Sequence, residues 1–169
     1  MENFVIPGEQ EFARLVQKLA SGLMKCGWLM ATAESCTGGW IAKVCTDLAG
    51  SSAWFDRGFV TYSDQAKQDL LGVDFSTLKK AGAVSRAIAI EMAEGARRQA
   101  GVNAALAVTG IAGPAGGTAD KPVGMVWFAW SLEGRQVSSE VMHFNGDRDA
   151  VRGQTVKHAL SGLLDLLGE

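Results

Sequence analysis

The stretch Ala33-Glu34-Ser35-Cys36-Thr37-Gly38-Gly39 decides how this chain folds. An apolar run from Trp28 to Ala33 precedes it and is typical of a buried strand. After it, apolar residues recur every three or four positions, which predicts one face of a helix; they are Trp40, Ile41, Val44 and Leu48. We therefore expect a strand-to-helix turn, where unpaired helix amides favour negative charge such as a phosphate or the oxyanion of an acyl-transfer intermediate.

The side chains of this turn offer two candidate nucleophiles. Ser35 can act as a cap, an anion ligand or a nucleophile, while Cys36 at a helix start is expected to have a lowered thiol pKa. A cysteine nucleophile usually has a histidine partner, and His143 and His158 both lie far away in the chain. A serine activated by a lysine is the more economical arrangement. Glu34 either orients a partner or faces solvent.

Composition limits the class of protein. The chain has 169 residues, of which 47% are hydrophobic in short runs, so one domain over residues 1–169 with a sizeable core is expected and a membrane span is not. A net charge of −2 argues against a general nucleic-acid binder. The acidic N-terminus does not resemble a secretory signal. With three cysteines, no Cys-x-x-Cys and two distant histidines, we expect a reduced, cytoplasmic protein without a metal site.

Helical and strand patterns alternate along the chain. Helices are predicted over residues 8–26, from 40 to just before 50, over 64–71, near 76–80, over 85–100 and over 147–167. Strands are predicted over residues 28–33, 58–62, 104–109, 125–130 and 136–144, the last two joined by a turn at Glu133-Gly134. This alternation with one hairpin predicts an α/β fold, a three-layer α/β/α sandwich on a mixed sheet.

Lys67 is the first candidate partner for the turn. Its neighbours three and four residues on are Leu70 and Leu71, so it shares the apolar face of a short helix. Either it extends its amine to solvent, or it is desolvated, which lowers its pKa and makes it a plausible general base. Helical side chains lean toward the N-terminus, so its amine should point toward Tyr62. Tyr62, the only tyrosine, is either a core-edge residue with a solvated hydroxyl or a functional one.

Two arginines begin the last predicted helix. Arg148 and Arg152 are one turn apart on the inward stripe, and a cation at a helix N-terminus opposes the helix dipole. An anionic partner is therefore expected, which could simply be Asp147, Asp149 or another acidic side chain.

A loop with five glycines, Gly110 to Gly124, follows the third predicted strand. It lacks the Lys-Ser/Thr pair of a Walker loop and does not match G-x-G-x-x-G. It offers backbone amides at the carboxyl end of a strand, where ligands of open α/β sheets bind, although a plain flexible loop has the same composition.

Four motifs in order carry a family resemblance. They are A-E-S-C-T-G-G, then G-F-V-T-Y-S-D-Q-A-K ending at Lys67, then T-G-I-A-G-P-A-G-G with K-P-V-G, and G-D-R-D-A-V-R. Together they resemble the CinA C-terminal domain family from Ala33 to Arg152. The chain looks like the stand-alone form, without the molybdopterin-binding-like domain that precedes this domain in CinA proteins.

The resemblance implies an activity and its residues. Stand-alone members of this kind are similar to enzymes that convert nicotinamide mononucleotide to nicotinate mononucleotide and ammonia in the pyridine nucleotide cycle. The family's serine, lysine and tyrosine fall on Ser35, Lys67 and Tyr62. Its arginine falls on Arg148, with Arg152 as the less certain choice. Some members lack the tyrosine and the activity, so Tyr62 favours an active copy.

From these residues we expect a Ser-Lys mechanism without metal or cofactor. Lys67 takes the proton of Ser35 directly or through Tyr62, and Ser35 attacks the carboxamide carbon. The oxyanion is expected on amides at Thr37, Gly38 and Gly39. The 5′-phosphate is expected on Arg148 or Arg152, helped by loop amides at Gly110, Ala112 and Gly113.

Two other functions stay open at this stage. One is an amidase for a different carboxamide, and the other is a catalytically silent nucleotide-binding or regulatory protein, because CinA-type domains are also linked with competence and DNA damage responses. No nucleic acid and no membrane are expected as partners. The apolar strand with Trp127 and Trp130 could pack against helices or against a second subunit, and a homo-oligomer, taken to be a dimer, is expected.

Overall fold

A mixed sheet of five strands runs through the middle of the molecule, in the order β2-β1-β3-β4-β5. The computed structural model describes residues 6–168. The strands are β1 (Met30–Glu34), β2 (Phe55–Val60), β3 (Ala104–Gly110), β4 (Met125–Leu132) and β5 (Ser138–His143). β1 pairs in parallel with both β2 and β3, whereas β4 is antiparallel to β3 and β5 is antiparallel to β4. The sheet is therefore mixed, as the sequence predicts.

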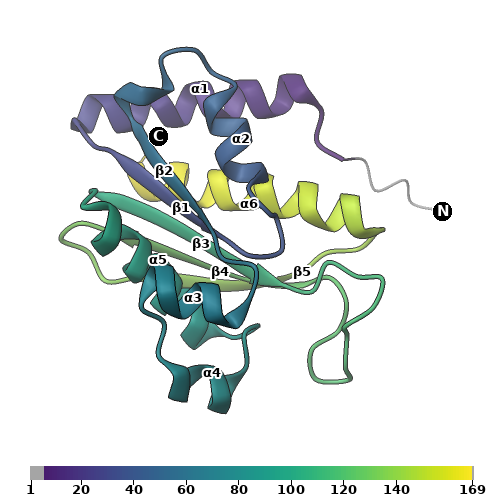
Figure 1. The fold of residues 1–169 in the computed structure, drawn as a ribbon. Coiled ribbons are helices and arrows are strands. Elements are labelled where there is room, and N and C mark those ends of the chain that lie inside the picture. Colours follow the sequence, from purple (N-terminus) through teal and green to yellow (C-terminus); the bar gives the residue numbers. More distant parts are fainter. Residues whose placement is uncertain (1–5, 169) are drawn as a thin grey trace.

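Helices cover both faces of this sheet (Figure 1). Among residues 6–168 they are α1 (Glu9–Cys26), α2 (Trp40–Thr46), α3 (Asp64–Leu71), α4 (Phe75–Ala81), α5 (Arg86–Ala100), α6 (Arg148–Leu167) and the 3-10 turn η1 (Ser51–Ala53). Helices α1, α2 and α6 lie on one face, and α3, α4 and α5 lie on the other (Figure 1). The predicted three-layer α/β/α sandwich is confirmed.

Two apolar clusters hold the layers together. On the first face, large side chains fill the space between sheet and helices, including Leu19, Ile41, Phe128 and Leu160, each fully buried. On the second face, alanines from α5 and from the strands bring the helix close to the sheet. Burying apolar surface on both faces explains why β1, with burial at all five positions, reads as a continuous apolar run.

Most element boundaries agree with the sequence prediction, and β2 is the exception. The strand was predicted over residues 58–62 and instead spans Phe55–Val60. It ends early because the next two main-chain carbonyls, those of Thr61 and Tyr62, face the amine of Lys67. Ser63 then caps α3 by accepting a hydrogen bond from the Ala66 amide.

The topology brings four segments to one edge of the sheet. Because β1, β2 and β3 are parallel, their carboxyl ends meet there. The loop from Gly110 to Gly124 leaves and returns at the same edge, since Gly110 pairs with Val126. α6 begins beside it, because β5 runs parallel to β3 through two antiparallel pairings. The sequence-predicted site residues lie on these segments, except Lys67, which lies on α3, the helix that follows β2.

Candidate active site

Ser35 is the first residue after β1. Its amide donates a hydrogen bond to the Val108 carbonyl at 3.1 Å, which continues the pairing with β3 and fixes the backbone at this point. The side chain is 8% exposed, and its Oγ lies 3.2 Å from the Nζ of Lys67. The two residues are 32 positions apart in sequence, and the parallel pairing of β1 with β2 brings them together.

Lys67 is buried, with 1% of its surface exposed, so of the two sequence readings the desolvated one is confirmed. Its amine lies 2.9 Å from the Thr61 carbonyl and 3.4 Å from the Tyr62 carbonyl. No carboxylate among the described residues forms an ion pair with it. Burial lowers the pKa of Lys67, and the charge of Asp64 only partly offsets this.

The three contacts of this amine fit its neutral form. An uncharged amine has two N–H donors and one lone pair. When the amine is neutral, the two carbonyls can accept its two N–H groups, which leaves the lone pair for the hydroxyl of Ser35; when it is protonated, it can donate to all three oxygens. The arrangement can therefore remove the proton of Ser35 without an intervening group.

Cys36 differs from the expectation for a helix start. The residue is buried, and burial raises the pKa of its thiol to about 12 instead of lowering it. The thiolate is consequently disfavoured at neutral pH, and Ser35 is the better placed nucleophile of the two.

Glu34 holds the turn in place, a function that sequence reasoning left open. The residue is fully buried at the end of β1 and accepts five hydrogen bonds. The donors are the hydroxyls of Thr32 and Thr37 and the amides of Gly39, Ile41 and Ala42. One carboxylate thus joins β1, the turn and the first turn of α2.

This carboxylate changes which amides are free. α2 begins only at Trp40, so residues 36–39 form a turn in which Gly38 and Gly39 adopt positive φ. The Gly39 amide donates to Glu34, and the Gly38 amide donates to the Ser35 carbonyl. Of the three predicted oxyanion donors, two are therefore already engaged. Within the described part of the chain, the amides of Cys36 and Thr37 form no hydrogen bond to another residue.

The two arginines of α6 have separate surroundings. Arg152 donates to the carbonyls of Cys36 and Thr37 at 3.1 and 3.0 Å, and its guanidinium lies 5.4 Å from the centre of the Trp40 ring. A weaker contact joins it to Asp149 at 3.4 Å. Arg152 therefore holds the turn through the carbonyls of Cys36 and Thr37, the same two residues whose amides are free.

Arg148 instead lies at the cavity. It donates to the Gly113 carbonyl at 2.7 Å and to the Tyr62 hydroxyl at 3.2 Å, and it pairs with neither neighbouring aspartate. Tyr62 is 64% exposed, and its hydroxyl contacts Arg148, whereas Lys67 reaches only its main-chain carbonyl. The direct proton transfer is thus better supported by the geometry than a relay through the phenol.

A cavity of about 210 Å³ opens over these groups. It is lined by Ser35, Cys36, Tyr62, Asp64, Lys67, Ala83, Val84, Thr109, Gly110, Ala112 and Arg148. Of the residues predicted from sequence, Thr37, Gly38, Gly39, Gly113 and Arg152 lie outside this lining.

Sequence reasoning gave no function to Asp64 and Thr109, which line the cavity, or to Lys121, which does not line it. Thr109 donates its hydroxyl to the Ala83 carbonyl at 2.9 Å and so fixes the wall that faces β3. Lys121 donates to the Ala81 carbonyl at 2.7 Å and ties the glycine-rich loop to the end of α4. All three carried a sequence signal, because Asp64 lies in the motif that ends at Lys67, and Thr109 and Lys121 begin two further motifs.

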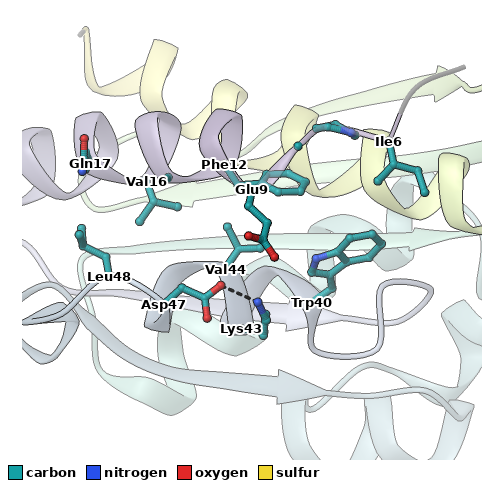
Figure 2. A pocket seen from close by; sticks show the side chains of 13 residues that line it. Ile6, Glu9, Phe12, Val16, Gln17, Trp40, Lys43, Val44, Asp47 and Leu48 are labelled. Carbon is teal, nitrogen blue, oxygen red and sulfur yellow. Dashed lines mark hydrogen bonds and ion pairs between the residues drawn. The ribbon is translucent and has the colours of Figure 1, made fainter.

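A larger cavity, about 900 Å³, lies between α1 and α2 and holds none of the predicted site residues (Figure 2). Apolar side chains form most of its wall, among them Phe12, Val16, Trp40 and Val44, and the Lys43–Asp47 ion pair lies at its rim (Figure 2). It contains no nucleophile beside a base, so the smaller cavity is the candidate active site.

Residues 6–168 contain neither a metal-binding cluster of His, Cys, Asp or Glu side chains nor a helix that could span a membrane. Nowhere in this range do three His, Cys, Asp or Glu side chains gather in a way that could hold a metal ion. None of the helices in the same range has the length and hydropathy required to cross a membrane.

Comparison with known proteins identifies relatives over most of the chain. Nicotinamide-nucleotide amidohydrolase PncC of Escherichia coli K12 is 49% identical over 155 residues, which cover 92% of this chain and 94% of that protein. The PncC of Enterobacter agglomerans is 51% identical over 156 residues, covering 92% and 95%. A CinA-like protein of Geotalea daltonii is 50% identical over 162 residues, 94% of this chain but 39% of that longer protein.

Solved structures agree with these relatives. The competence/damage inducible protein CihA from Agrobacterium tumefaciens superposes with a TM-score of 0.91 at 44% identity, covering 98% of this chain and 99% of that one. A CinA superfamily protein from Klebsiella pneumoniae gives 0.89 at 41% identity, covering 93% and 98%. The model of the CinA C-terminal domain matches residues 12–167. This chain is therefore a member of the CinA C-terminal domain family.

Proposed function

We propose that this protein hydrolyses the carboxamide of nicotinamide mononucleotide, giving nicotinate mononucleotide and ammonia, a reaction of the pyridine nucleotide cycle. One observation carries the proposal: the buried amine of Lys67 lies 3.2 Å from the Ser35 hydroxyl, beside the free amides of the turn. Relatives about half identical to this chain are named nicotinamide-nucleotide amidohydrolases, which supports the choice of substrate.

The first half of the reaction forms an acyl-enzyme. Lys67 accepts the proton of Ser35 as Oγ bonds to the carboxamide carbon, and the carbonyl electrons move onto oxygen. The protonated lysine then gives its proton to the amide nitrogen, the C–N bond breaks and ammonia leaves. The carbonyls of Thr61 and Tyr62 keep the amine oriented throughout.

The oxyanion of this step is assigned to the amides of Cys36 and Thr37. Arg152 holds the carbonyls of these same two residues, and Glu34 holds the Thr37 hydroxyl at 2.7 Å, so the amides are fixed before substrate arrives. In well-studied hydrolases one such donor contributes roughly 3–4 kcal/mol to the transition state.

Water completes the reaction at the same groups. Lys67 accepts a proton from water as its oxygen attacks the ester carbon, and Ser35 leaves and regains a proton from Lys67. The products are nicotinate mononucleotide and an unchanged enzyme. Arg148, with three N–H groups beyond the two that contact Gly113 and Tyr62, is the residue assigned to the phosphate.

The test is ammonia release from nicotinamide mononucleotide by the wild type and by Ser35→Ala. We expect turnover by the wild type and loss of at least about 10³-fold in the variant, because no nucleophile remains. Ser21→Ala, on the exposed face of α1, is the matched control and should keep full activity. Full turnover by Ser35→Ala would refute the mechanism.

The same assay addresses the choice of carboxamide. Nicotinamide riboside and free nicotinamide lack the phosphate, so both should be poorer substrates than the mononucleotide if Arg148 binds that group. Faster release from free nicotinamide would reassign the protein to a different amidase class.

A further inference from the structure

The cavity that contains Ser35 and Lys67 carries one acidic side chain among its lining residues, Asp64. Asp64 is the first residue of α3, directly after the Ser63 cap, and it is exposed. No residue in the described part of the chain donates a hydrogen bond to its carboxylate or forms an ion pair with it. The mechanism above gives this carboxylate no function.

The cavity wall carries one positive and one negative side chain that do not pair with each other. Arg148 provides a cation at the Tyr62 hydroxyl, and Asp64 provides an anion two residues further along the chain from Tyr62. The exposed ring of Tyr62 belongs to the same wall. A ligand that fills this cavity therefore meets a positive group, an aromatic face and a negative group.

Nicotinamide mononucleotide has a matching distribution of charge. Its N-glycosidic bond makes the ring a pyridinium with a permanent positive charge, while its phosphate is negative. A carboxylate attracts such a ring over several ångströms, and an aromatic face attracts it further. Free nicotinamide has a neutral ring and offers neither attraction.

We propose that Asp64 is a specificity-determining residue that recognises the positive charge of the pyridinium ring. The inference rests on the proposed function for the identity of the ligand. It adds a basis for choosing a glycosylated, cationic nicotinamide over a neutral carboxamide. The carboxylate acts by attraction to the ring and takes no part in proton transfer.

Asp64 also influences the catalytic base, and this second effect must be separated from the first. Its charge partly offsets the lowering of the Lys67 pKa by burial. Removing the carboxylate should therefore alter proton transfer for every substrate alike. Recognition of the ring charge, in contrast, affects only ligands whose ring is cationic. Comparing a ligand with a cationic ring and one with a neutral ring therefore separates this recognition from the effect on Lys67.

The experiment measures binding in a Ser35→Ala background, where no ligand is consumed. One ligand is nicotinamide mononucleotide, and the other is the 5′-phosphate of benzamide riboside, whose ring is neutral and joined through carbon. Adding Asp64→Asn should weaken binding of the cationic ligand by about tenfold and of the neutral one by less than about threefold. Calorimetric titration gives both dissociation constants, and the selective loss should shrink at high salt.

The control is Asp69→Asn in the same background. Asp69 lies on α3, is exposed, does not line the cavity and contacts Gln65, so its removal changes net charge equally. Neither ligand should respond to it. Equal weakening of both ligands by Asp64→Asn, or no weakening of either, would overturn the inference.

The results distinguish failure of the hydrolysis proposal from failure of the inference about Asp64. If wild-type protein binds nicotinamide mononucleotide but releases no ammonia, the hydrolysis proposal fails while the charge comparison still decides the function of Asp64. If nicotinamide mononucleotide binds neither the wild type nor the Ser35→Ala protein and the wild type releases no ammonia, both proposals are overturned.

Discussion

Lys67 places an amine nitrogen inside the protein where no carboxylate among the described residues pairs with it. A buried ammonium is costly, and here the cost appears as a lowered pKa. Burial therefore increases the fraction of Lys67 that is neutral at a given pH. Burial of Lys67 thus lowers the stability of the folded state and makes the amine a better base at neutral pH. Both effects can be measured.

The pH profile should report this base. Because the amine must be uncharged to accept the proton of Ser35, kcat/KM should rise as pH increases through the lowered pKa of Lys67 and then level off. The midpoint should lie below the ordinary value of 10.5. Ammonia release measured from mildly acidic to alkaline pH checks this. A midpoint at or above 10.5 would contradict the assignment.

Lys67→Met should remove activity and raise stability. Loss of the base should lower kcat by about 10²–10⁴-fold at neutral pH. The folded state disfavours protonation of Lys67, so it loses stability as pH falls from 10.5 through the lowered pKa, and the loss is complete below that pKa. Methionine avoids this loss, so thermal unfolding should occur at a higher temperature in the variant.

The gain in stability should disappear as pH approaches 10.5, where the lysine is neutral in both states. Lys79→Met, on the exposed face of α4, serves as the control and should change neither quantity appreciably. A Lys67→Met protein that turns over normally would show that the amine only fills space.

At the scale of elements, the turn between β1 and α2 is fixed by two charged side chains. Glu34 binds it from the core through five hydrogen bonds, and Arg152 of α6 binds its carbonyls from outside. α2 has only seven residues, so it depends on these contacts more than on its own helix propensity. The position of Ser35 is therefore set by three elements together.

Glu34→Gln tests this assembly. Either orientation of the amide turns an NH₂ group toward at least two of the five donors, and each buried unsatisfied donor costs about 1–3 kcal/mol. The free energy of unfolding should fall by roughly 2–5 kcal/mol. Because the turn loosens, kcat should fall more than KM rises, by about 10-fold or more.

Denaturant unfolding and steady-state kinetics measure these two effects. Glu94→Gln, at an exposed position of α5, is the matched control and should leave both unchanged. A Glu34→Gln protein with normal kcat would show that the five hydrogen bonds stabilise the fold without positioning the nucleophile.

For the whole molecule, the cavity is an assembly of segments distant in sequence. Its lining comes from the ends of β1 and β3, the link after β2, α3, the loop before α5, the glycine-rich loop after β3 and the start of α6. A ligand that contacts these segments binds only the folded state and should stabilise all of it.

Ser35→Ala with nicotinamide mononucleotide should show this stabilisation. At a ligand concentration about 100 times Kd, the gain is about 2.7 kcal/mol, which raises Tm by roughly 5–10 °C for a chain of this size. Free nicotinamide at the same concentration should raise it far less. Equal shifts with both ligands would contradict recognition of the phosphate and of the ring charge.

Much of this molecule could be predicted from its sequence, for physical reasons. The layers follow from periodicity, and the pairing of Ser35 with Lys67 follows from two motifs placed after neighbouring strands. Which amides of the turn are free could not be predicted. It depends on where α2 begins, at Trp40, and on the buried Glu34 carboxylate, which accepts the Gly39 amide. Likewise, Arg148 and Arg152 differ only in what the tertiary structure places beside them.

The base of this site is held by main-chain oxygens at positions 61 and 62, and this has an evolutionary consequence. Main-chain atoms are common to every amino acid, and the side chain at position 62 is exposed, so it can be exchanged without displacing the amine. Mutational drift there can remodel the cavity wall, as a Tyr62→Phe change would by releasing Arg148, while the proton acceptor stays aligned. Substrate preference can therefore change during evolution while the geometry of proton transfer stays the same.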